Sequence, residues 1–211
     1  MRATDLLGVV LAGGKGRRFG GEKATAPLGG HPMAEWVLEA LRPWTSEQVV
    51  ITNDPATAQC LNRPGRADLI PGKGPMGGLH TALNWAREEG KKGVFLLACD
   101  LPLVPPPLVG TILKKWPSGV KAVVPGSYGP RGFEPLCGGY STEIIPILEK
   151  LLSNGDLAME AVLDHVGAHR IPASELGSEE ELRRAFTNVN TQEGARLAEL
   201  ALGEAVPGLD S

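Results

Sequence analysis

Short, continuous apolar runs alternate in the first half of the chain with segments of helical periodicity. Such runs occupy residues 6–11 and 94–99, and a β-branched run occupies residues 49–51. An apolar run without polar alternation, bounded by turn residues, is typical of a strand that is buried on both faces of a parallel sheet. The pattern therefore predicts three buried strands, and the strand at 94–99 runs directly into Asp100.

Segments of helical periodicity separate these runs. Over residues 33–41 the apolar positions recur at helical spacing behind Pro32, a residue that suits a helix start. Further helices are expected over 77–89 and 105–116, a strand over 121–125 and a short element near 69–70. A loop that enters a strand is expected over 131–140. The tail over 178–202 is expected to be helical and charged, except at 186–190. Strands that alternate with helices indicate βαβ units with right-handed crossovers. The predicted fold is α/β with a mostly parallel sheet, in a single domain spanning residues 1–211.

The composition is that of a folded, loop-rich chain, with 42% hydrophobic and 21% charged residues, Gly 28 and Pro 18 of 211. A net charge of −3 argues against a protein that binds nucleic acid through bulk positive charge. No apolar run approaches the ~18 residues of a membrane span, and the N-terminus lacks the layout of a signal peptide. The three cysteines form no C-x-x-C pair, which fits a reducing compartment. We therefore expect a soluble cytoplasmic protein that binds neither nucleic acid nor membranes.

A glycine-rich basic loop follows the first predicted strand. Its glycines include Gly13, Gly14, Gly16 and Gly20, and its cations are Lys15, Arg17, Arg18 and Lys23. Glycines allow a tight turn that brings backbone N–H groups close to a phosphate chain, and the cations balance the phosphate charge. The spacing matches neither the P-loop pattern nor the G-x-G-x-x-G dinucleotide pattern. The alternative is a basic surface turn, but the position of the loop directly after a strand favours phosphate binding.

Asp100 follows the clearest predicted strand. Ligands of open α/β sheets bind at the carboxyl ends of the strands. A carboxylate at that edge, beside a phosphate-binding loop, suits Mg2+, which is held by one or two carboxylates together with substrate phosphates. The alternative is that Asp100 caps the next helix, since Pro102, Pro105 and Pro106 follow it. The neighbouring glycine-rich loop favours the metal-binding interpretation.

Two further segments point to the same edge of the sheet. Asp68 precedes a loop of glycines and prolines over residues 71–78, and its carboxylate could bond a base or a ribose. Thr52 and Asn53 end the strand at 49–51, where an amide could bond a purine or a ribose. For the segment that begins at Asp68, the alternative is an ordinary connection before a helix. For Thr52 and Asn53, the alternative is a plain turn over residues 53–55.

The second half of the chain offers candidates for the acceptor side of a cleft. Glu134 precedes a run of small residues, and Arg131 lies near enough in sequence for the alternative of a solvated ion pair. Asn188 and Asn190 lie on one face of an extended segment, although Asn190 could instead cap the last helix. The sequence offers no Ser-His-Asp or Cys-His arrangement, and Cys99, inside an apolar run, is expected to be a small core residue.

Five motifs, in this order, resemble those of the molybdenum cofactor guanylyltransferases of the MobA-like nucleotidyltransferase family. They are L-A-G-G-x-x-x-R-F-G-x-x-K over 11–23, D-x-x-P-G-x-G-P-M-x-G over 68–78, C-D-L-P over 99–102, E-P-L over 134–136 and N-V-N-T over 188–191. The resemblance covers about residues 6–200. The first and third motifs are shared with nucleotidyltransferases of sugars and terpenoid precursors, whereas the G-P-M-x-G loop and the N-V-N-T tail favour the molybdenum branch.

The resemblance implies a Rossmann-like three-layer α/β sandwich of the nucleotide-diphospho-sugar transferase type that binds GTP and Mg2+. The nucleotide half would span about residues 6–104 and the acceptor half about residues 105–200. The implied nucleotide contacts are Leu11, Ala12, Gly13, Gly14, Lys23, Asn53, Asp68 and Asp100. The implied catalytic residues are Lys23, Asp100 and Arg18, with Asp100 as the metal ligand, and the implied acceptor contacts are Glu134, Asn188 and Asn190.

The implied reaction is transfer of GMP from GTP to molybdopterin or Mo-molybdopterin, which forms the molybdopterin guanine dinucleotide and releases pyrophosphate. The same chemistry with CTP is an alternative, and the L-A-G-G loop in place of A-A-G favours guanine. Two further hypotheses are a nucleotidyltransferase acting on another small phosphorylated acceptor, such as a sugar phosphate or phospholactate, and a non-catalytic GTP-binding accessory protein. Molybdoenzyme chaperones or other cofactor-biosynthesis proteins are the expected protein partners.

Overall fold

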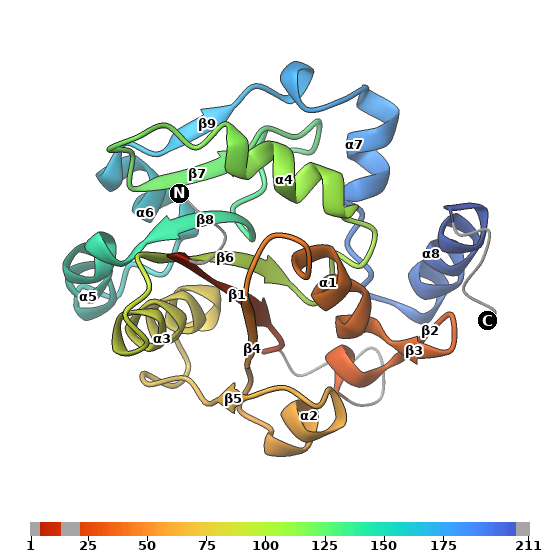
Figure 1. The fold of residues 1–211 in the computed structure, drawn as a ribbon, viewed down its shortest axis with the longest axis horizontal. Helices are drawn as coiled ribbons and strands as arrows, with labels where there is room; N and C mark the ends of the chain where they lie inside the picture. The colour runs from red at the N-terminus through yellow and green to blue at the C-terminus, as the bar shows by residue number, and fades with distance from the viewer. Residues whose placement is uncertain (1–4, 14–21, 206–211) are drawn as a thin grey trace.

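A computed structural model describes residues 5–13 and 22–205 of the chain, with the side chains of the last helix described to Gly203 (Figure 1). Seven strands of this part form one sheet in the order β5–β4–β1–β6–β8–β7–β9. Their bounds are β1 Leu6–Leu11, β4 Glu47–Ile51, β5 Gly65–Arg66, β6 Gly93–Ala98, β7 Ala122–Pro125, β8 Cys137–Ser141 and β9 His169–Ile171. Strand β8 is antiparallel to its neighbours β6 and β7, and the other pairings are parallel. The predicted α/β class with a mostly parallel sheet is confirmed.

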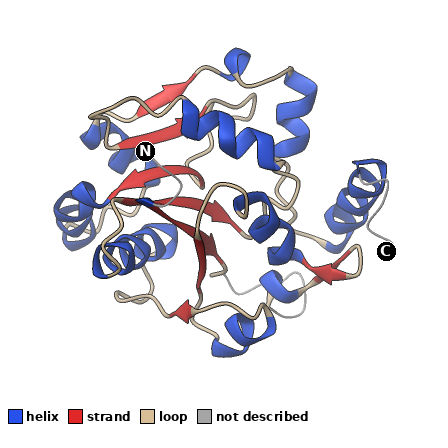
Figure 2. Cartoon of the chain, in the orientation of Figure 1, coloured by secondary structure: helices blue, strands red, loops and turns tan. Residues whose placement is uncertain are grey.

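Helices cover both faces of the sheet and complete three layers (Figure 2). One face is covered by α1 Met33–Leu41, α4 Pro106–Lys114 and α7 Glu179–Ala185, and the other by α3 Gly74–Glu88, α5 Ile145–Ser153 and α6 Met159–Val166. The shorter helices are η2 Lys23–Thr25, α2 Pro55–Cys60, η3 Thr142–Ile144 and η4 Ala173–Glu175. The Rossmann-like three-layer arrangement implied by the motifs is confirmed.

The continuous apolar runs of the central strands follow from burial on both faces. In β1, Val10 packs into the core under α1 and α4, while Val9 packs into the core under α3 and α5. Both side chains are fully buried. Because successive side chains of a strand point to opposite faces, a polar residue at either position would face a core, and each buried valine contributes about 1.5–3 kcal/mol.

The region before α3 differs from the sequence prediction. Residues 69–70 form bends, and the neighbouring strand is β5, which pairs with β4. The side chain of Leu69 is 56% exposed, so its apolar character does not mark a buried element. Helix α3 begins three residues earlier than expected, at Gly74, because Pro75 occupies its first turn, where the missing proline N–H costs nothing.

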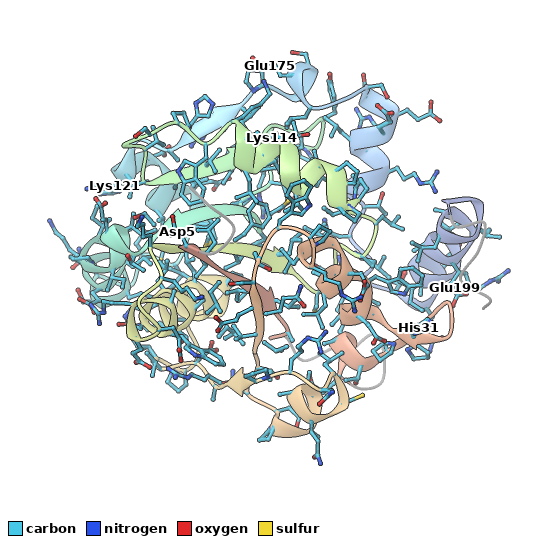
Figure 3. The ribbon with its side chains drawn as sticks, in the orientation of Figure 1. Asp5, His31, Lys114, Lys121, Glu175 and Glu199 are labelled. Atoms are coloured by element: carbon cyan, nitrogen blue, oxygen red, sulfur yellow. The ribbon has the colours of Figure 1, made fainter. Side chains whose placement is uncertain are left out.

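The last helix, α8 Gln192–Ala205, lies at the right of Figure 1 against a small hairpin of β2 Pro27–Leu28 and β3 His31–Pro32. Ala195 and Ala198 of α8 pack with Leu28 into a third apolar cluster. The carboxylate of Glu199 accepts a hydrogen bond from the Gly29 N–H at 2.9 Å, and Figure 3 shows Glu199 on the same side of the molecule as His31. Among the described helices, none is long and apolar enough to cross a bilayer.

Candidate nucleotide-binding site

The carboxyl ends of β4, β1 and β6 lie side by side at one edge of the sheet. Leu11 is in register with Ile51 on one neighbour and with Ala98 on the other. The ladder continues one residue further, because the Ala12 N–H donates to Ile51 O at 2.9 Å and the Cys99 N–H donates to Leu11 O at 3.0 Å. The residues that follow these strands therefore start from one line, as the parallel pairing requires.

Lys23, Asp100 and Asn190 meet at this edge. Lys23 opens the short helix η2, Asp100 follows β6, and Asn190 precedes α8. The Lys23 ammonium donates to Asp100 Oδ2 at 2.9 Å and to Asn190 Oδ1 at 2.5 Å. The Lys23 side chain is 13% exposed and the Asp100 side chain 23% exposed. An ammonium and a carboxylate are thus held together in a partly desolvated position, where a charge-assisted hydrogen bond is stronger than at the surface.

The backbone around Asp100 ties the C-terminal segment to the sheet. The Val189 N–H donates to Asp100 O at 2.9 Å, and the Val189 side chain is fully buried. This anchor sets the position of Asn190 next to it. Asp100 does not cap a helix, because α4 begins at Pro106 with Pro105 as its N-cap residue. The alternative of a capping aspartate is therefore wrong.

Cys99 is a core residue, as expected, with 5% of its surface exposed. Burial raises the pKa of its thiol to about 12, and the neighbouring Asp100 carboxylate contributes to this rise. A thiol held in the neutral form is a poor nucleophile. Cys99 therefore supports the strand end and does not enter the chemistry.

Asn53 and Asp68 form a second pair at the same edge. Asn53 Nδ2 donates to Asp68 Oδ2 at 2.9 Å, and the Asp68 N–H donates to Asn53 Oδ1 at 3.0 Å. Thr52 is 5% exposed, and its hydroxyl accepts from the Asp54 N–H, so it is used inside the turn. Asp54 in turn caps α2 by accepting from the Ala56 N–H. Asp54 therefore makes the turn, and Asn53 remains exposed beside Asp68.

Gly78 lies where α3 passes under the end of β1. A Cβ atom at Gly78 would lie 2.9 Å from Leu11 Cδ2 and 3.7 Å from Asp68 Oδ1. Glycine therefore lets the first turns of α3 approach both residues closely. The end of β1, the Asp68 loop and α3 form one packed unit. Gly13, by contrast, is exposed and has open space at its Cβ position.

Glu134 lies on the loop that leads from β7 to β8, and backbone bonds hold that loop. The Glu134 N–H donates to Pro125 O at 2.9 Å, and Glu134 Oε1 accepts from the Leu136 N–H at 3.3 Å. Burial raises the pKa of the Glu134 carboxyl and the Asp100 charge adds to this rise, whereas the Leu136 N–H and the Arg131 charge lower the pKa. The field of Asp100 therefore reaches Glu134. The Arg131 guanidinium lies 3.8 Å from the Glu160 carboxylate, and its charge also acts on Glu134.

Tyr140 is a supporting residue that the sequence did not single out. Its fully buried hydroxyl donates to Pro135 O at 2.5 Å, which fixes the peptide next to Glu134. The preceding glycines shape no pocket: a Cβ at Gly138 would lie 2.6 Å from Val123 O, and one at Gly139 would strike the Trp116 ring. The hydrogen bond to Pro135 O is what makes Tyr140 a supporting residue, and no local sequence pattern indicates a bond of this kind.

The structure brings most of the predicted residues to one edge. Leu11 ends β1 and is followed by Ala12 and Gly13. The contacts of six further residues are given above: Lys23, Asn53, Asp68, Asp100, Glu134 and Asn190. Asn188 is exposed, two residues before Asn190. Gly14 and Arg18 lie outside the described residues. Among residues that the structure describes, no three His, Cys, Asp or Glu side chains gather to hold a metal. A single carboxylate suits a metal that keeps other ligands from substrate phosphates, so the residues fit Mg2+ arriving with a nucleotide.

An open, mostly parallel α/β sheet with a lysine, a carboxylate and amides at its carboxyl edge has the ligand site typical of α/β enzymes, and the sequence relatives make that enzyme a nucleotidyltransferase. The profile of the MobA-like NTP transferase domain matches residues 8–170. The chain belongs to this family, and the resemblance seen in its motifs is confirmed.

Relatives and solved structures agree with this assignment. The chain is 31% identical over 198 residues to a molybdenum cofactor guanylyltransferase of Desulfosudis oleivorans, covering 93% of this chain and 96% of the relative. It is 34% identical to a molybdenum cofactor guanylyltransferase of Cereibacter sphaeroides, covering 93% and 97%. The crystal structure of molybdopterin-guanine dinucleotide biosynthesis protein A from Archaeoglobus fulgidus superposes with a TM-score of 0.76 at 26% identity, covering 94% of this chain and 100% of that one.

Proposed function

We propose that this chain transfers GMP from GTP to the terminal phosphate of molybdopterin or Mo-molybdopterin and releases pyrophosphate. The observation that carries the proposal is the Lys23–Asp100 pair at the carboxyl edge of a chain that is similar over 93% of its length to named guanylyltransferases. The bond between the α-phosphorus and its bridging oxygen breaks, and the acceptor phosphate oxygen forms the new bond. The acceptor oxygen is already anionic, so no strong general base is needed.

Catalysis then depends on positioning and on charge stabilisation. Lys23 contacts the phosphates and draws charge onto the leaving pyrophosphate, and Arg18 is proposed to act with it. Mg2+ held by Asp100 and the substrate phosphates would neutralise charge at the α-phosphate. The partly buried position of the Lys23–Asp100 pair supports these roles, because electrostatic effects are larger where water is excluded.

The nucleotide half of the site, about residues 6–104, is proposed to hold GTP. Leu11, Ala12, Gly13 and Gly14 would contact it through backbone groups. The Asn53–Asp68 pair, which is reachable from solvent at Asn53, would bond the base and the ribose. The open space around Gly13 supports a close approach of the ligand to the backbone.

The acceptor half, about residues 105–200, is proposed to hold molybdopterin within the same single domain. Glu134, Asn188 and Asn190 are the proposed contacts. Support comes from Glu134, whose carboxyl feels the charge of Asp100 across the edge of the sheet, and from Asn190, which contacts Lys23 directly. An acceptor held there would lie next to the proposed phosphate site.

We also propose that the reaction takes place in the cytoplasm and that molybdoenzyme chaperones or other cofactor-biosynthesis proteins receive the product. Cys60, Cys99 and Cys137 are all free thiols, which suits a reducing compartment.

The test is pyrophosphate release by the purified protein with Mg2+ and molybdopterin, comparing GTP, CTP, ATP and UTP. Release with GTP that depends on molybdopterin is the expected result. Release with CTP alone would establish the cytidylyltransferase alternative. GTP binding without release would contradict the proposed reaction and favour a binding protein or another acceptor.

A further inference from the structure

The Lys23 ammonium occupies the position of a cation between two oxygens. Its two acceptors, Asp100 Oδ2 and Asn190 Oδ1, come from segments that are 77 and 167 residues away in sequence. With 13% of its side chain exposed, Lys23 has little contact with water. The carboxylate proposed to hold the metal is therefore already neutralised by a cation of the chain itself.

A divalent ion that binds Asp100 while this ammonium stays in place would lie within a few ångströms of a second positive charge. Like charges a few ångströms apart repel strongly in a partly desolvated site. If the ammonium left its carboxylate, the partner it would keep among the described residues is the neutral amide of Asn190. A partly buried ammonium without an anionic partner is costly. A nucleotide removes this cost, because its phosphates offer Lys23 a new anion.

We propose that Lys23 competes with the metal for Asp100. As a result, the metal binds weakly to the chain without nucleotide, and metal and nucleotide bind together. The inference rests on the proposed function, which assigns the nucleotide and the metal to this edge. Lys23 thus has two partners in turn: Asp100 before the nucleotide binds, and a phosphate afterwards. Because binding energies are reciprocal, the metal must raise the nucleotide affinity by the same factor as the nucleotide raises the metal affinity.

Asn190 keeps the ammonium within reach of both partners. Its segment is anchored where the Val189 N–H bonds Asp100 O, and α8 continues to the β2–β3 hairpin, where Glu199 bonds Gly29. The amide oxygen carries no net charge, so it can hold Lys23 without competing with a phosphate for it. The neighbouring Asp100 is free for a metal once Lys23 turns to the nucleotide.

The experiment titrates Mn2+ as the probe metal into the full chain without nucleotide and measures free Mn2+ by electron paramagnetic resonance. Lys23→Met removes the competing charge, and Lys23→Arg keeps a charge. Lys114→Met is the matched control for net charge, because Lys114 lies in the last turn of α4, and Asp100 precedes the first turn of that helix in the chain (Figure 3). The double variant Lys23→Met/Asp100→Asn tests whether Mn2+ binds at Asp100.

Lys23→Met is expected to bind Mn2+ at least about tenfold more tightly than the unchanged chain, given the charge removed from the site. Lys23→Arg and Lys114→Met are expected to leave Mn2+ binding unchanged, and the double variant to abolish the gain. Equal Mn2+ binding by Lys23→Met and the unchanged chain, each measured below its own melting temperature, would overturn the competition. So would a gain that persists in the double variant. Pyrophosphate release is measured separately, so failure of the proposed reaction is distinguishable from failure of the competition.

Discussion

Asn53 and Asp68 hold each other in a reciprocal pair, in which the Asn53 side-chain amide donates to the Asp68 carboxylate at 2.9 Å and the Asp68 backbone N–H donates to Asn53 Oδ1 at 3.0 Å. The pair joins the end of β4 to the loop before α3 across 15 residues of sequence. Each residue therefore orients the other, and their proposed contacts to the nucleotide are coupled.

Asn53→Ala and Asp68→Ala are each expected to weaken GTP binding by about tenfold, because each variant loses one hydrogen bond to the nucleotide and a bond of this kind contributes about 1.4 kcal/mol. The double variant is expected to lose less than the product of the two effects, because the first change already frees the second residue. Calorimetric titration with GTP measures the four affinities. Strictly multiplicative losses would contradict the coupling.

Asp100→Asn is expected to lower the transfer rate by about a hundredfold or more, because it removes the only charge of this side chain while keeping an oxygen for Lys23. The melting temperature should fall, because the variant leaves the partly buried Lys23 ammonium without its anionic partner, so the rate is compared at a temperature where both chains are folded. The measurement is pyrophosphate release with Mg2+. Asp164→Asn, on a surface ion pair with Arg170, is the control and should keep the full rate. A near-normal rate for Asp100→Asn would remove Asp100 from the metal role.

Glu134→Gln is expected to change how stability depends on pH. Burial is the main cause that raises the Glu134 pKa above its ordinary 4.5, and the Asp100 charge adds to it. The folded chain therefore holds this proton more tightly than the unfolded chain. The resulting stabilisation is complete below pH 4.5 and is lost as the pH rises through the folded-state pKa.

The glutamine variant has no such proton to lose. Its free energy of unfolding, relative to that of the unchanged chain, should therefore rise as the pH increases from 4.5 through the folded-state pKa of Glu134. Urea unfolding at several pH values measures this difference. A difference that stays constant over the range would show that the Glu134 carboxyl titrates alike in both states.

Gly78→Ala is expected to lower the free energy of unfolding by about 1 kcal/mol and to weaken GTP binding, because its methyl group would displace the buried Leu11 side chain at the end of β1. Gly203→Ala is the matched control in α8: a Cβ there meets nothing within 4 Å, so the change should stabilise the helix by about 0.5–1 kcal/mol. Thermal unfolding measures both effects. Equal stabilisation at the two positions would mean that α3 does not press on Leu11.

Local patterns predicted the central elements well. Strand β1 and helix α1 have the predicted bounds, Leu6–Leu11 and Met33–Leu41, because an unbroken apolar run and a helical repeat need only neighbouring residues to be recognised. Helices α5 and α6 and strand β9 were not predicted. Helices α5 and α6 carry a helical repeat of the same kind as α1, so the sequence contains their signal, whereas β9 has three residues and is too short to show a period.

The sequence by itself determined the α/β class, the glycine-rich loop and the residues that end each strand, since these depend on spacing along the chain. Only the tertiary structure decided which of those residues meet. Parallel register brought Asp100 beside the end of β1, and the packing of Val189 brought Asn190 to Lys23 across 167 residues. The tertiary structure also gave two adjacent residues different contacts: the Asn53 side chain bonds Asp68, and the Thr52 hydroxyl accepts a hydrogen bond inside a turn. Contacts between distant segments depend on strand order and packing, and both are properties of the whole fold.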